Sequence, residues 1–324
     1  MEIHPRNPHG FQDAAQFSHE YSRARCKHKG LEKIMGAFIR NMSRVRGIGL
    51  LPINFISITV VNESARMEAL ANLGIPFHDP RITRHHPNFD AELFDEVDAE
   101  RKRLVEVWLQ KAGTNRDKAV FDSGTYHLNV IIDSNQQDSW EAVQAALAAM
   151  VLGLWTAFES SMQDVWITAV NAHPKLLADR VLKTLDKEDQ QKFLPGNIIS
   201  DAGYDLRNCM GDILLRKRAV DFQRLKSLKR AYDIAFDNEF ESIVSKHYAA
   251  LEQLEAVRNL FAHKGGVIDE RFRSKLKNPP EMEVGHIYCV TGRYVADQAD
   301  TVSECSTALV TGVDDWLEKN QVVA

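Results

Sequence analysis

Apolar residues recur at steps of three and four through almost all of the sequence after residue 138, which is the period of one helix face. The first helix expected there is apolar on two sides, because two neighbouring stripes run along it. We expect one side to pack within a helical bundle and the other to be available to a second subunit. The two stripes are Leu147, Val151, Leu154, Phe158 and Val165, and Trp155, Met162 and Trp166.

Helices are predicted over residues 139–171, 174–193, 204–217 and 221–236, followed by a long helix up to Gly265 and a closing helix centred on Leu309. A short strand-like segment at 285–290 precedes the closing helix. This C-terminal part of the chain, residues 138–324, is therefore expected to be a helical bundle with a short strand-like insertion.

The sequence before this bundle favours a smaller α+β region. Residues 52–61 and 126–133 are rich in β-branched side chains and are predicted as strands. Helical spacing covers about 31–46, 64–73 and 90–111, the last with Asp90 as its N-cap. Polar turn-forming residues then mark a boundary, so we predict a mainly α fold class with domains at 1–137 and 138–324.

No phosphate-binding Walker loop, glycine-rich dinucleotide turn or nucleophile elbow occurs in residues 1–137. The alternative that this region carries the main activity therefore has no motif to support it. We expect it to act in sensing, substrate choice or partner binding.

Composition narrows the class of protein. The 324 residues are 44% hydrophobic and 26% charged with a net charge of −5, which is typical of a soluble globular protein and unlike a protein that coats nucleic acid. The four cysteines are scattered, and the adjacent histidines His85 and His86 lack further ligands at metal-binding spacing. We expect a cytoplasmic protein with no metal, no cofactor and no membrane segment, since no uninterrupted apolar run reaches about 18 residues.

The most basic tract lies between Arg23 and Arg46. It could follow a phosphate backbone, because neutralising phosphates releases counterions. It could equally be the solvated face of a helix. The tract comprises Arg23, Arg25, Lys27, Lys29, Lys33, Arg40, Arg44 and Arg46.

The long helix ends in an unusual group of polar residues. Its apolar stripe reaches Leu251 and Leu254, and the next position in register is Arg258. An arginine is rarely buried without a partner, so an arginine in a core stripe needs an explanation. Asn259 lies one turn before His263, and Gly265 can end the helix in a left-handed conformation. The structural explanation is that these are cations favoured at a helix C-terminus.

A carboxylate in the first bundle helix offers a partner for this arginine. Glu159 lies within the second apolar stripe, one turn from Trp155. Because a buried carboxylate must be paired, protonated or functional, Glu159 and Arg258 are predicted to pair.

Taken together, these residues resemble the HEPN family. The resemblance covers about residues 138–324. It depends on Arg258 and His263 with four residues between them, on Asn259 directly after Arg258, and on Glu159 in the first helix. HEPN domains are small helical bundles, many of which are metal-independent ribonucleases of toxin-antitoxin, abortive-infection and CRISPR systems. In one branch a tyrosine two residues after the histidine is modified with AMP, and Gly265 stands there in this sequence.

The resemblance implies an endoribonuclease that leaves a 2′,3′-cyclic phosphate, with Arg258, Asn259, His263 and Glu159 as catalytic residues. Histidine changes charge near neutral pH and arginine is always ionised, so these residue types suit metal-free phosphate chemistry. The implied partners are RNA, a second copy of the chain, and an antitoxin or defence-system protein. The alternative is a non-catalytic HEPN-like module that binds a nucleotide or a protein.

Overall fold

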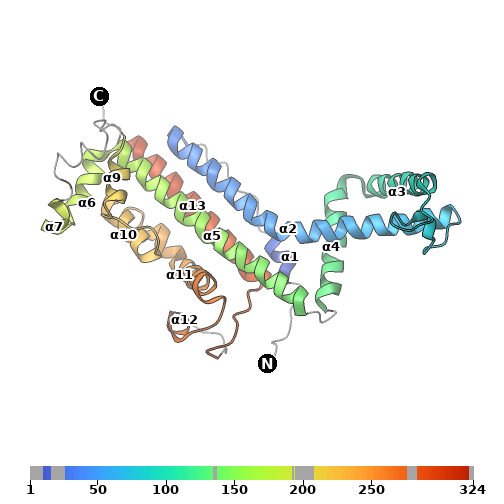
Figure 1. The fold of residues 1–324 in the computed structure, drawn as a ribbon. Coiled ribbons are helices and arrows are strands. Elements are labelled where there is room, and N and C mark those ends of the chain that lie inside the picture. Colours follow the sequence, from blue (N-terminus) through green and yellow to red (C-terminus); the bar gives the residue numbers. More distant parts are fainter. Residues whose placement is uncertain are drawn as a thin grey trace. The chain divides into compact units, whose positions relative to one another are not determined.

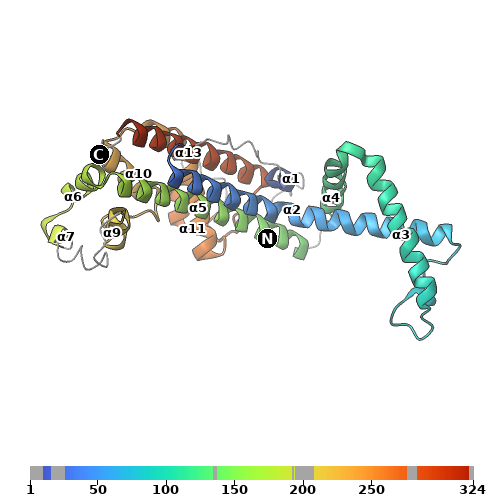
Figure 2. The ribbon, with the colours of Figure 1, turned by 90° about the horizontal axis from the view of Figure 1, so that it is seen from above.

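The computed structural model describes residues 10–15, 26–133, 137–191, 193, 208–275 and 283–320. Within these ranges the chain is mainly helical and contains no strand, as Figures 1 and 2 show. The helices are α1 Gly10–Ala15, α2 Lys29–Asn72, η1 Pro80–Ile82, α3 Ala91–Ala112, η2 Gly113–Asn115, α4 Arg116–Asp133, α5 Gln137–Ala172, η3 Pro174–Ala178, α6 Asp179–Lys183, α7 Lys187–Gln191, α9 Met210–Arg216, α10 Leu225–Phe236, α11 Glu241–Lys264, α12 Glu270–Lys275 and α13 Gly292–Lys319.

The chain divides into two compact units that interleave in sequence. We call Met1–Gln12 with Ile48–Val143 the inserted unit, and Asp13–Gly47 with Gln144–Ala324 the bundle unit. The helices α2 and α5 each contribute residues to both units. The bundle unit therefore includes the first part of α2 as well as the C-terminal helices.

The bundle unit is built around α5. Its side chains Trp155, Phe158 and Trp166 have no exposed surface, and Trp166 Nε1 donates to the carbonyl of Ala231 in α10 over 3.0 Å. The long helix α11 packs against both α10 and α13. The predicted bundle is thus confirmed at the level of a mainly helical fold.

Both apolar stripes of α5 are covered within the single chain. Trp155, Met162 and Trp166 are fully buried, and the hydroxyl of Tyr232 donates to the Met162 carbonyl over 2.8 Å. A second subunit is therefore not needed to bury the second stripe, contrary to what its apolar character indicated.

The inserted unit has a smaller core. Ala69 and Leu70 of α2 pack with Ile82 and with Val97 of α3. The N-cap of α3 is Asp90, as predicted, whose Oδ1 accepts hydrogen bonds from the amides of Glu92 and Leu93.

The α+β description of the N-terminal region is wrong, because both predicted strands are helical. Residues 52–61 lie within α2 and residues 126–133 within α4. Ile53 and Ser57, four residues apart, are fully buried, whereas Phe55 is 71% exposed, so burial follows a helical rather than an alternating pattern. Since β-propensity reflects packing context and spans only about 1 kcal/mol, helix packing overrides it here.

Two segments differ from the expected bundle helices in detail. The region predicted as one helix at 174–193 is divided into the π-helical turn η3 and the short helices α6 and α7. The first residues of the helix predicted over 204–217 lie outside the described residues. The strand-like segment forms one isolated antiparallel bridge, between Val267 and Ile287.

By length and composition alone, α2 and α5 each contain a window apolar enough to cross a membrane, although polar residues interrupt both windows. The core helix of a soluble protein passes the same test, and α5 is the core helix of the bundle unit. These two helices are therefore weak evidence for a membrane.

Candidate functional site: a basic cavity at the end of helix α11

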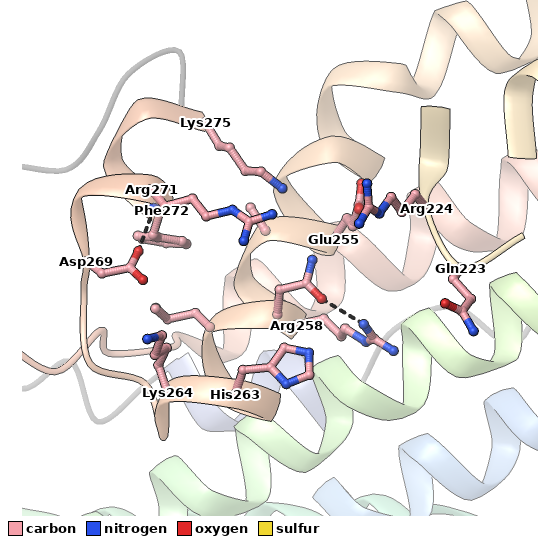
Figure 3. Close-up of a pocket in the computed structure, with 13 residues that line it drawn as sticks. Gln223, Arg224, Glu255, Arg258, His263, Lys264, Asp269, Arg271, Phe272 and Lys275 are labelled. Atoms are coloured by element: carbon pink, nitrogen blue, oxygen red, sulfur yellow. Dashed lines mark hydrogen bonds between the residues drawn. The ribbon is translucent and has the colours of Figure 1, made fainter. Parts of the chain in front are cut away.

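A cavity of about 480 Å³ in the bundle unit contains three of the four predicted site residues. Arg258, Asn259 and His263, all from the last two turns of α11, line it together. The other walls come from α12 and from the segment that leads into α10. Figure 3 shows the side chains of Arg258 and His263 directed toward the same space.

The helix end that carries them is fixed by a left-handed residue. Gly265 has φ 58° and ends α11, and its amide donates to the carbonyl of Leu260. A residue with a Cβ is disfavoured in this conformation, which explains why a glycine stands two residues after His263. His263 is consequently held in the final turn, where its side chain is exposed.

The half-buried Arg258 is held by its sequence neighbour. Its Nη1 donates to Asn259 Oδ1 over 2.7 Å. The guanidinium retains further N–H donors, so most of its hydrogen-bonding capacity remains for an anion in the cavity.

Glu159 does not line this cavity, and the predicted pairing with Arg258 does not form. The Glu159 Oε2 instead accepts a hydrogen bond from Trp155 Nε1 over 2.7 Å, and no ion pair joins it to Arg258 within 4.0 Å. Burial raises the pKa of the Glu159 carboxyl, an effect opposed by the Trp155 hydrogen bond and by the charge of Arg258. The carboxyl is thus near enough to be influenced by Arg258 without contacting it.

The cavity has a strongly positive lining in a chain whose net charge is −5. Five cationic side chains face two carboxylates, a surplus of three positive charges before His263 is counted. Such a local excess marks a site for an anion. The cations are Arg224, Arg258, Lys264, Arg271 and Lys275, and the carboxylates are Glu255 and Asp269.

Sequence reasoning missed four of these cations. Arg271 and Lys275 belong to a short basic segment directly after the Gly265–Gly266 turn, and that proximity to the motif is a signal that could have identified them. Lys264 follows His263 directly, and its place next to the motif is a second such signal. Arg224 lies more than thirty residues before the motif and reaches the cavity only through the packing of α10 on α11.

The basic tract between Arg23 and Arg46 has structural contacts where it is described. Lys27 Nζ interacts with Glu318 and Asp315, and the Lys27 amide donates to the buried Asp314 over 2.8 Å. Arg46 Nε donates to the carbonyl of Ala15 over 2.9 Å. Arg23 and Arg25 lie outside the described residues, and whether the tract also binds phosphate stays a prediction.

Comparison of the chain with protein-family models, with curated proteins and with solved structures found no match. The function therefore has to be inferred from the chemistry of the cavity.

Proposed function

We propose that this protein is a HEPN-like, metal-independent endoribonuclease that works in the cytoplasm as a toxin or an anti-phage effector. The observation that carries the proposal is the gathering of Arg258, Asn259 and His263 in one cavity with a surplus of positive charge. An anionic substrate, a fixed cation and a group that transfers protons are the minimum that RNA cleavage without a metal requires.

In the proposed reaction, the 2′-oxygen of the RNA attacks the adjacent phosphorus and the bond to the 5′-oxygen breaks. The 2′-hydroxyl loses its proton, the leaving 5′-oxygen gains one, and the products are a 2′,3′-cyclic phosphate and a 5′-hydroxyl. Arg258 stabilises the charge that develops on the phosphorane oxygens. His263 transfers a proton, because imidazole can donate or accept one near neutral pH.

Asn259 has a positioning role in this scheme. Its side-chain oxygen accepts from Arg258, which restricts the guanidinium to one orientation. Pre-organised donors stabilise a transition state more effectively than mobile ones. Glu159, the fourth residue predicted for the site, lies outside the cavity, so this scheme gives it no contact with the RNA.

One cavity has one histidine, whereas the reaction needs both a proton acceptor and a proton donor. We therefore propose that two copies of the chain bring two cavities together, so that each contributes a His263. Mass measurement in solution tests this part, because a monomer that cleaves RNA at full rate contradicts it.

The central test is incubation of the purified chain with total RNA in the presence of EDTA. We expect cleavage by the wild type and none by His263→Ala or Arg258→Ala, with helicity unchanged by circular dichroism. The matched control is His85→Ala, an exposed histidine of the inserted unit, which should cleave like the wild type.

Equal cleavage by the wild type and the His263 variant would contradict the catalytic assignment and indicate a contaminating nuclease. Binding of RNA without cleavage would favour the alternative of a non-catalytic nucleotide- or protein-binding module. The exposure of His263 beside an arginine held by Asn259 is compatible with such a module, in which the pair binds phosphate only.

A further inference from the structure

The short helix α12 presents a basic face to the cavity. Arg271 and Lys275 are four residues apart, so they lie on one side of the helix, and both line the cavity. Arg273 is exposed between them and does not line it. The cavity therefore receives the cations of one face of α12 rather than the whole basic segment.

This face is held in place by the contacts of Phe272, a neighbouring residue of α12 that also lines the cavity. Asp269 Oδ1 accepts from the Phe272 amide over 2.8 Å, and the Phe272 side chain is buried against Tyr288, with ring centroids 5.3 Å apart. The Tyr288 amide donates to the Gly266 carbonyl over 2.8 Å. Through Tyr288, α12 is thus anchored to Gly266, just after the end of α11. This anchoring fixes the positions of Arg271 and Lys275.

Across the cavity, Arg224 supplies a third cation from the N-cap position of α10. Figure 3 shows Arg271 and Lys275 extending from α12 toward the side of the cavity on which Arg224 lies. Among the described residues, none of the three cations has an ion-pair partner within 4.0 Å, and all three are exposed. Unpaired cations around one cavity are available to an anion from outside.

The dimensions favour more than one phosphate. A sphere of 480 Å³ is roughly 10 Å across, whereas a stacked strand advances about 3.4 Å per nucleotide. One phosphate at Arg258 and His263 therefore leaves room for a neighbouring phosphate within reach of the other cations.

We propose that Arg224, Arg271 and Lys275 form a phosphate-binding subsite that holds the RNA strand beside the scissile phosphate. This inference rests on the ribonuclease function proposed above, and it specifies a single strand spanning several phosphates as the substrate rather than a mononucleotide. Arg258 and His263 act on one phosphate, and the subsite sets the register of the strand.

The test uses the full-length wild-type chain with 2′-O-methyl RNA of one, two, three and six nucleotides, which cannot undergo 2′-hydroxyl attack. We expect the affinity to rise with each added phosphate up to at least three nucleotides. In the triple variant Arg224→Ala, Arg271→Ala, Lys275→Ala, the affinity for the hexamer should weaken roughly tenfold or more. The slope of log K against the logarithm of the salt concentration should become shallower by about 2, which is about 0.7 for each lost phosphate contact.

The matched control is the pair Arg273→Ala and Arg230→Ala, which removes exposed cations from α12 and α10 that do not line the cavity. It should bind like the wild type. In cleavage assays the triple variant should show a raised KM with kcat changed by less than about twofold, because the subsite binds the ground state and the transition state alike.

Equal binding by the triple and control variants, or an affinity that no longer rises beyond one nucleotide, would overturn the subsite. Failure of the ribonuclease proposal looks different: the wild type then does not cleave RNA, while the dependence of binding on length and on these three cations remains.

Discussion

The half-buried Glu159 should make the stability of the protein depend on pH. Burial raises the pKa of its carboxyl above the ordinary value of 4.5, so the folded protein binds this proton more tightly than the unfolded chain. The corresponding stability is fully present below about pH 4.5 and is lost as the pH rises through the folded pKa. Glu159→Gln keeps an acceptor for Trp155 but carries no charge. As the pH rises from 4 to 8, the unfolding midpoint of this variant should therefore fall less than that of the wild type.

Chemical denaturation of both proteins from pH 4 to pH 8 measures the difference. The control is Glu239→Gln, an exposed carboxylate of the bundle unit, which should follow the wild-type curve. Parallel curves for Glu159→Gln and the wild type would show that the Glu159 carboxyl ionises as it does in the unfolded chain.

Asn259 provides a second residue-scale prediction, about catalysis. Asn259→Ala removes the acceptor of Arg258 Nη1, so the guanidinium loses its fixed orientation. We expect kcat to fall roughly tenfold, and Asn259→Ala to add little further loss in an Arg258→Ala background, since both changes affect one unit. Additive losses in this double-mutant cycle would assign Asn259 a role independent of Arg258.

These residues also show what sequence can predict about a site. Arg258, Asn259 and His263 belong to one helix, so their spacing alone predicted that they share a region of space. The partner of Glu159 depends on how α5 faces α11, and the spacing within either helix does not contain that information. For this reason the motif was found, whereas the pairing of Glu159 with Arg258 was predicted incorrectly.

At the scale of elements, the end of α11 is the feature on which the motif depends. Gly265 has φ 58° and nothing lies within 4 Å of an added Cβ, so Gly265→Ala meets no clash but adopts a disfavoured left-handed conformation. We expect a loss of about 1 kcal/mol in the free energy of unfolding, and faster amide exchange at His263. Gly265→Asn should retain more stability because asparagine tolerates this conformation. Equal losses in the two variants would point to contacts rather than backbone conformation.

The elements of the N-terminal region show why a local pattern can mislead. The segment at 52–61 has the β-branched composition of a strand, yet it is the middle of a 44-residue helix. Its buried residue Ile53 packs against α4, whose Gly124 lies against the carbonyl of Ile53. Asp90 and Gly265, by contrast, act within a few residues of themselves, and sequence predicted both helix ends correctly.

For the whole molecule, the division into two units predicts that a substitution can destabilise one unit and leave the other folded. A Cβ added at Gly124 would lie 2.1 Å from the Ile53 carbonyl oxygen, so Gly124→Ala must force α4 away from α2 within the inserted unit. Overpacking of this kind costs roughly 1–3 kcal/mol. We expect limited proteolysis to cut first within residues 48–143, while the cavity of the bundle unit still binds RNA.

The matched control for that experiment is Gly47→Ala, a glycine of α2 with nothing within 4 Å of the added Cβ, which should stabilise the helix by about 0.5–1 kcal/mol. RNA cleavage by Gly124→Ala at the wild-type rate would limit catalysis to the bundle unit. If Gly124→Ala abolishes cleavage while the bundle unit stays resistant to protease, the inserted unit takes part in recognising the substrate. That outcome would support the expectation that residues 1–137, which include most of the inserted unit, act in sensing, substrate choice or partner binding.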